Sequence, residues 1–144
     1  MNPTFQDHGR INTIGINMAK QKRILIEKSF LFAVRMVNLF QHLSGKKKEY
    51  ILSKQILRSG TSVGSNIREA FNAESKIDFI HKLAIAQKEI DETCYWLQLL
   101  HVTDVLSDKE YKSLLADADE LLKLTRSTIL TSKQNLKSPS KSRT

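Results

Sequence analysis

The chain has 144 residues, the length of a single domain. Its 23 Lys and Arg against 15 Asp and Glu give a formal net charge of +8, and only two Pro and five Gly interrupt a composition rich in helix formers. The lone cysteine, Cys94, excludes an internal disulfide and a cysteine-based zinc cluster. No apolar run approaches the roughly 20 residues of a membrane span. We therefore expect a soluble, helical protein of the cytoplasm.

The charge is distributed unevenly along the chain. Residues 20–58 carry ten bases and two acids, whereas residues 68–130 carry eight bases and twelve acids. The last fourteen residues add four bases and no acid. A basic half beside an acidic half indicates either attraction between copies of the chain or contact of the basic half with a polyanion. A surface that serves solubility alone remains the simplest alternative.

Residues 1–18 are predicted to form a flexible arm, because they contain Pro3, Gly9 and Gly15 and show no sustained period. They also lack the features of a signal peptide.

A helix is predicted over residues 19–43, where apolar residues at spacings of 4, 3, 4 and 3 indicate one buried stripe. The stripe comprises Ile26, Phe30, Ala33, Val37 and Phe40, and is widened by Leu31 and Val34.

The same spacing predicts three more helices. The second begins near residue 47 with Glu49 in its first turn; the third opens at Ser75 and the fourth at Ser107, both good N-caps. Their predicted core stripes are Leu52, Ile56, Ser59, Val63, Ile67 and Ala70; Phe79, Leu83, Ala86, Ile90, Thr93, Leu97 and Leu100; and Tyr111, Leu115, Ala118, Leu122, Thr125 and Ile129. Because the connections are short, we predict an all-α, antiparallel up-down four-helix bundle over residues 19–132. Residues 133–144, rich in Ser and Lys, are predicted to be a disordered basic tail.

The segment over residues 58–69 is unusually rich in Ser and Gly for a helix. It lacks the spacing of a phosphate-binding loop, and no strand is predicted before it. Gly60 and Gly64 have the spacing of a membrane-helix dimer motif, but Arg58 and Arg68 flank it. We favour a third interpretation, in which the small residues let another helix approach closely.

A polar stripe runs beside the apolar one in this segment and comprises Arg58, Ser62, Asn66 and Glu69. Glu89 and Glu92 share one face of the third helix. We predict that Arg58 pairs with Glu89, that Ser62 and Asn66 bond to each other or to nearby backbone, and that the network fixes helix register. Ligand binding by the same residues is the competing hypothesis.

Three stretches combine polar and small positions in a distinctive order: Arg-Ser-x-x-Ser-x-x-x-Asn-Ile-x-Glu over residues 58–69, Asp78-Phe79, and Lys88-Glu89-x-x-Glu92-x-x-Tyr95-Trp96-Leu97. Together they resemble a bacterial family of four-helix bundles that includes the proteins encoded in intervening sequences of 23S ribosomal RNA genes. The accessory proteins of diversity-generating retroelements are related. The resemblance covers residues 20–132, and Ala70 stands where the family usually has glycine.

The resemblance implies a homo-oligomer with a basic surface, typically a homopentamer. For the retroelement branch it also implies association with a reverse transcriptase and nucleic acid. For most members no biochemical activity is established. Five copies of a chain with a net charge of +8 would carry about +40, which favours a polyanion as partner.

No catalytic set is visible, and we expect neither enzymatic activity nor a metal or other cofactor. A di-iron bundle needs two Glu-x-x-His pairs, and Asp78-x-x-His81 is the nearest approach. We expect His81 to lie on the outside of its helix and Cys94 to be a buried structural thiol. His101 is placed to offset the helix dipole at the end of the third helix.

Nucleic-acid binding is expected through two groups of basic residues at opposite ends of the first helical hairpin. The candidates are Lys20, Lys22 and Arg23 in one group and Lys46, Lys47, Lys48 and Lys54 in the other. Such residues bind RNA or DNA phosphates weakly and without reading sequence. Tyr95 and Trp96 are expected to be packed rather than to stack on bases. The alternative is a self-assembling structural or protein-interaction module with no nucleic-acid role.

Overall fold

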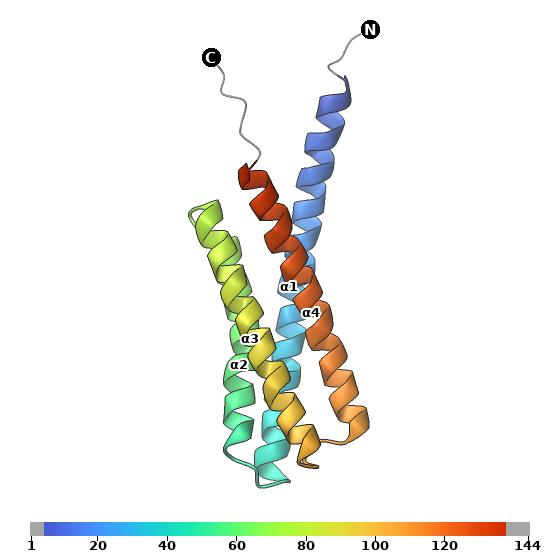
Figure 1. The fold of residues 1–144 in the computed structure, drawn as a ribbon, viewed down its shortest axis with the longest axis vertical. Coiled ribbons are helices and arrows are strands. Elements are labelled where there is room, and N and C mark those ends of the chain that lie inside the picture. The colour runs from blue at the N-terminus through green and yellow to red at the C-terminus, as the bar shows by residue number, and fades with distance from the viewer. Residues whose placement is uncertain (1–4, 138–144) are drawn as a thin grey trace.

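The computed structural model describes the backbone of residues 5–137 and the side chains of residues 17–137. This part of the chain forms four helices: α1 (Phe5–Gly45), α2 (Leu52–Phe71), α3 (Lys76–Val102) and α4 (Asp108–Lys137). Each helix packs against the next, and α4 packs back against α1. Consecutive helices run in opposite directions (Figure 1). The predicted up-down four-helix bundle is confirmed.

The first and last helices are longer than predicted. α1 begins at Phe5, inside the segment expected to be a flexible arm, and it includes Gly9 and Gly15. Each glycine costs only about 1 kcal/mol in a helix, and a helix that is already nucleated gains a hydrogen bond for each residue it adds. The same reasoning applies to α4, which extends to Lys137 and so enters the expected tail. Residues 1–4 and 138–144 lie outside the described residues.

Two serine caps fix the starts of α3 and α4. The Ser75 hydroxyl accepts a hydrogen bond of 3.1 Å from the backbone N–H of Asp78. The Ser107 hydroxyl accepts one of 3.2 Å from the backbone N–H of Glu110. Each bond satisfies one of the N–H groups that a helix start leaves without a partner. Both predicted caps are confirmed.

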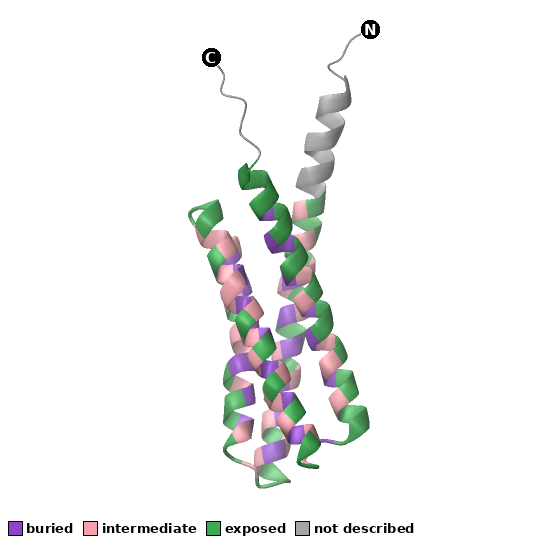
Figure 2. Cartoon of the chain, viewed as in Figure 1, coloured by how far each residue is buried: buried purple, intermediate pink, exposed green. Residues whose placement is uncertain are grey.

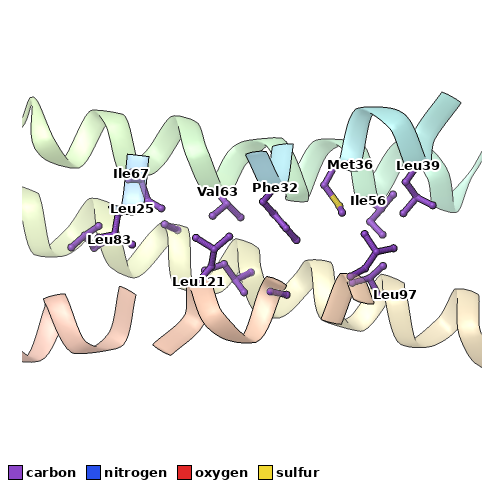
Figure 3. Packing of buried hydrophobic residues seen from close by; sticks show 14 of the residues in the cluster. Leu25, Phe32, Met36, Leu39, Ile56, Val63, Ile67, Leu83, Leu97 and Leu121 are labelled. Carbon is purple, nitrogen blue, oxygen red and sulfur yellow. The ribbon is translucent and has the colours of Figure 1, made fainter. Parts of the chain in front are cut away.

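The hydrophobic core runs the length of the bundle between all four helices (Figures 2 and 3). The predicted stripes of α2 and α3 are buried, although Leu52 and Phe79 are only partly so. In α4 the buried leucines are Leu114 and Leu121, each one position before the predicted residue. The predicted α4 residues Ala118, Thr125 and Ile129 are buried, so the α4 stripe is confirmed in part, whereas the stripes of α2 and α3 are confirmed along their length.

The predicted core stripe of α1 is wrong. The buried residues are a second stripe with the same 4–3 spacing, namely Leu25, Ser29, Phe32, Met36, Leu39 and Leu43. Four residues expected in the core form an outer face of α1, with Phe30 54%, Leu31 56%, Val34 41% and Val37 38% exposed. Periodicity could not choose between two stripes of equal period. The choice comes from the packing of α1 against α2.

Gly60 and Gly64 bring α2 close to α1. A Cβ atom on Gly60 would lie 2.2 Å from Met36 Cγ, and one on Gly64 would lie 3.3 Å from the Ser29 carbonyl oxygen. Both distances are shorter than normal van der Waals contacts between these atoms. The interpretation of this segment as a site of close helix approach is confirmed, and the approaching helix is α1.

A buried hydrogen bond joins α2 to α3 within the core. The hydroxyls of Ser59 and Thr93, both fully buried, lie 2.9 Å apart. Thr93 Oγ1 also lies 2.7 Å from the carbonyl oxygen of Glu89. Among the described residues no buried side-chain nitrogen or oxygen lacks a partner. The hydroxyl pair therefore stays in the core without the cost of an unsatisfied polar group.

Gly60→Ala is expected to destabilise the protein by about 1–3 kcal/mol, since the added methyl group must displace Met36 from a packed core. This loss exceeds the gain of about 1 kcal/mol in helix propensity. The free energy of unfolding in urea measures the change. The double variant with Met36→Ala should lose less than the sum of the two single losses, because the shorter side chain makes room for the methyl group. Additive losses in the double variant would contradict the proposed contact.

Candidate nucleic-acid interface

Lys46, Lys47 and Lys48, here called the lysine turn, connect α1 to α2. The turn is held by the backbone N–H of Lys46, which donates to the carbonyl oxygen of His42 at 2.9 Å. Lys48 adopts a left-handed conformation with φ 56°, which reverses the chain. All three lysine side chains are exposed. The turn thus presents three adjacent charges on a fixed backbone.

Glu49 follows the lysine turn and caps α2. Its carboxylate accepts hydrogen bonds from the backbone N–H groups of Ile51 at 3.2 Å, Leu52 at 2.9 Å and Ser53 at 2.7 Å. Burial alone would raise the pKa of Glu49, but these hydrogen bonds outweigh it and the pKa lies below its usual value. α2 begins at Leu52 and not near residue 47 as predicted, so Glu49 precedes the helix instead of lying in its first turn. The negative charge is held by backbone groups rather than by the neighbouring lysines.

The second basic group lies nearer the other end of the hairpin. Lys20, Lys22 and Arg23 are exposed on α1, roughly 36 Å along the helix from the lysine turn. Lys22 Nζ lies 5.9 Å from the ring centroid of Phe71 at the end of α2. Lys54 is exposed on α2, close to the lysine turn. The two groups are separate, as the antiparallel arrangement predicts.

Other basic residues of α1 are neutralised by acids of α4. Lys28 Nζ lies 2.6 Å from Glu120 Oε1, and the hydrogen bond to Glu120 raises the pKa of Lys28. Arg35 Nη1 lies 2.6 Å from Asp117 Oδ2. Within the described part of the chain, seven basic residues of the first hairpin form no ion pair with an acidic side chain and belong to the predicted interface. They are Lys20, Lys22, Arg23, Lys46, Lys47, Lys48 and Lys54.

Arg58 joins α2 to α3 through two carboxylates. Its Nη1 lies 3.5 Å from Glu89 Oε2 and its Nη2 lies 2.5 Å from Glu92 Oε1. Trp96 Nε1 also donates to Glu92 Oε1 at 3.3 Å. The hydrogen bond from Arg58 lowers the pKa of Glu92 in spite of its partial burial. The shorter contact makes Glu92, rather than the predicted Glu89, the main partner of Arg58.

The rest of the predicted polar network bonds locally. Ser62 Oγ donates to the Arg58 carbonyl oxygen at 2.6 Å, and Asn66 Nδ2 donates to the Ser62 carbonyl oxygen at 2.8 Å. Glu69 Oε2 lies 3.1 Å from Lys82 Nζ on α3. The Arg58 side chain is 51% exposed, so water screens its ion pairs. A role of the network in fixing helix register stays a prediction.

One of the two aromatic residues expected to be packed is on the surface. Tyr95 is 55% exposed, whereas Trp96 is half-buried against it, with ring centroids 5.0 Å apart. The buried positions of α3 on either side are Thr93 and Leu97. Tyr95 lies two residues from each, which places it on the opposite side of the helix. The expectation for Tyr95 is therefore wrong.

His101, Cys94 and His81, the other residues considered for a chemical role, lie in surroundings that do not form a catalytic or metal site within the described part of the chain. His101 Nε2 pairs with Asp108 and its ring stacks on Tyr111 with centroids 4.2 Å apart; the hydrogen bond from His101 lowers the pKa of Asp108. Burial raises the pKa of Cys94 to about 11, and His81 is exposed.

The described residues contain no cluster of three or more His, Cys, Asp or Glu suited to a metal ion. No helix in the described part of the chain has both the length and the apolarity needed to cross a membrane.

A double-mutant cycle on Arg58→Ala with Glu92→Ala should give a coupling of about 0.5–1 kcal/mol, as for other half-exposed pairs. The cycle with Glu89→Ala should give less, because the contact is 3.5 Å long. Urea unfolding at low and high salt measures both, and salt should weaken the coupling. A stronger coupling to Glu89 than to Glu92 would contradict this geometry.

Residues 21–127 match the family described as 23S rRNA-intervening sequence protein. A solved structure from Bacteroides thetaiotaomicron VPI-5482, described as a protein of unknown function from the S23 ribosomal protein family, is 50% identical with a TM-score of 0.75. The match covers 76% of this chain and 97% of that chain. No curated protein matches. The fold, the polar positions of α2 and α3, and these matches agree: the chain belongs to the 23S rRNA-intervening sequence protein family.

Proposed function

We propose that the protein is a non-enzymatic, homo-oligomeric accessory factor that binds RNA or DNA through phosphate contacts. The observation that carries the proposal is the contrast between two sets of basic side chains. In the middle of α1, Lys28 and Arg35 are neutralised by α4. At the lysine turn and Lys54 the charges are exposed and have no acidic partner within the described chain.

Charges without acidic partners release counterions when they contact phosphate, and this drives sequence-independent binding. The lysine turn carries three such charges on adjacent residues, and the Glu49 cap holds the chain directly after it. Contacts of this kind position a nucleic acid without reading its sequence. We infer that binding is weak, tolerant of sequence and steeply dependent on salt.

Self-assembly is the second part of the proposal, and the outer face of α1 supports it. Phe30, Leu31, Val34 and Val37 form one exposed apolar strip on α1, and Arg68 of α2 borders it with its Cζ 5.7 Å from the centroid of the Phe30 ring. Such a strip on a soluble helix is typical of a protein contact. A second copy of the chain is the partner we propose, in a homopentamer as the resemblance implies. A reverse transcriptase as a further partner stays a prediction, and it applies only if the chain belongs to the retroelement branch of the family. A reverse transcriptase gene next to the gene for this chain would support it.

Replacing Lys46, Lys47 and Lys48 with Glu should weaken binding of a labelled RNA by more than about tenfold, because three phosphate contacts are lost. Fluorescence polarisation between about 50 and 200 mM salt measures affinity and salt slope. The matched control carries Lys109→Glu, Lys112→Glu and Lys123→Glu on exposed positions of α4, with the same change in net charge. Equal losses in both variants would indicate that only net charge matters. An affinity that salt does not change would overturn the proposal, whereas loss of the oligomer would favour the interaction module.

Val34→Glu should dissociate the oligomer, because it places a charge in the centre of the outer face of α1. Light scattering during size exclusion should then give the mass of one 16.5 kDa chain. Val102→Glu is the matched control, since Val102 is 69% exposed at the end of α3. The prediction fails if the unmodified protein already has the mass of one chain, or if both variants dissociate.

A further inference from the structure

At the end of the bundle where α2 turns into α3, the helices surround a pocket of about 490 Å³. All four helices line it, with Lys22 from α1, Phe71 from α2, Lys76 and Phe79 from α3, and Ser132 and Asn135 from α4. The volume is within the range of about 300–1,000 Å³ that is usual for small-molecule pockets. No acid is found among the described residues that line it. The pocket therefore suits an anionic ligand.

One wall of the pocket is aromatic. Phe71 and Phe79 meet edge to face with their ring centroids 5.2 Å apart, and both are half-buried. Lys22 Nζ lies above the Phe71 ring, and Lys76 is the first residue of α3. Two exposed cations thus stand beside a partly exposed aromatic surface. This combination is typical of sites that stack a base and hold its phosphates.

Polar residues of α4 line the same pocket. Ser132, which is only 4% exposed, is one of them. Asn135, one turn further along α4, adds an exposed amide. These two groups offer hydrogen bonds to a flat polar ligand that enters between the helices.

We propose that this pocket receives one base of a single-stranded RNA or DNA. The base stacks on Phe71 or Phe79 and bonds to Ser132, while the neighbouring phosphates lie against Lys22 and Lys76. Lys20 and Arg23 on α1 continue the basic surface away from the pocket. A duplex supplies phosphates but keeps its bases stacked inside, so it cannot fill the pocket. The inference rests on the proposed nucleic-acid binding and adds a preference for single strands.

The test compares a short labelled oligouridine with a duplex RNA that has the same number of phosphates, at about 100 mM salt. The unmodified protein should bind the single strand about fivefold or more tightly than the duplex, given the usual strength of base stacking. Phe71→Leu with Phe79→Leu should abolish this preference and leave duplex binding unchanged. Tyr95→Leu on the exposed side of α3 is the matched control and should retain the preference. Circular dichroism reports whether each variant is folded.

A measurement on the unmodified protein covers the case in which the double variant does not fold. An oligonucleotide with 5-iodouridine is crosslinked to the protein by light, and mass spectrometry locates the attachment. Attachment at Phe71 or Phe79 supports the pocket, and attachment only at other residues overturns it. Equal affinity for single strand and duplex overturns the pocket but leaves the proposed phosphate binding intact. Failure to bind either nucleic acid overturns both.

Discussion

The close contact between α1 and α2 at Gly60 and Gly64 is the constraint on which the rest of this structure depends. A methyl group at Gly60 would overlap Met36, and one at Gly64 would press on the backbone of Ser29. The helices can approach this closely only with these residues facing each other. That contact fixes the rotation of α1 about its own axis, and the rotation in turn determines which side chains α1 buries.

The rotation of α1 also organises the charge. It directs Lys28 and Arg35 towards α4, where Glu120 and Asp117 neutralise them. The charges that remain without acidic partners on the first hairpin lie towards its two ends. The formal charge of +8 therefore describes the surface poorly, because the middle of α1 presents an apolar outer face between two basic regions.

The sequence predicted the four helices, the serine caps at Ser75 and Ser107, and the role of the small residues in α2, because each depends on local spacing. It did not predict the rotation of α1, since two stripes of equal period compete and only the contact with Gly60 decides between them. The exposure of Tyr95 was not predicted either, because Tyr95 lies between the buried residues Thr93 and Leu97 in the sequence. The aromatic pocket also escaped prediction, because Phe71 and Phe79 lie on different helices and meet only after the chain turns.

The apolar outer face of α1 and the basic ends of the hairpin have opposite effects on assembly. Burying the apolar strip against other copies favours association, but each copy adds a net charge of +8, and repulsion grows as copies accumulate. A polyanion bound across several copies reduces that repulsion. By thermodynamic linkage, a nucleic acid that binds the assembly more tightly than the single chain must also stabilise the assembly. We therefore propose that self-association and nucleic-acid binding are two coupled steps of one function rather than competing explanations of the same charge.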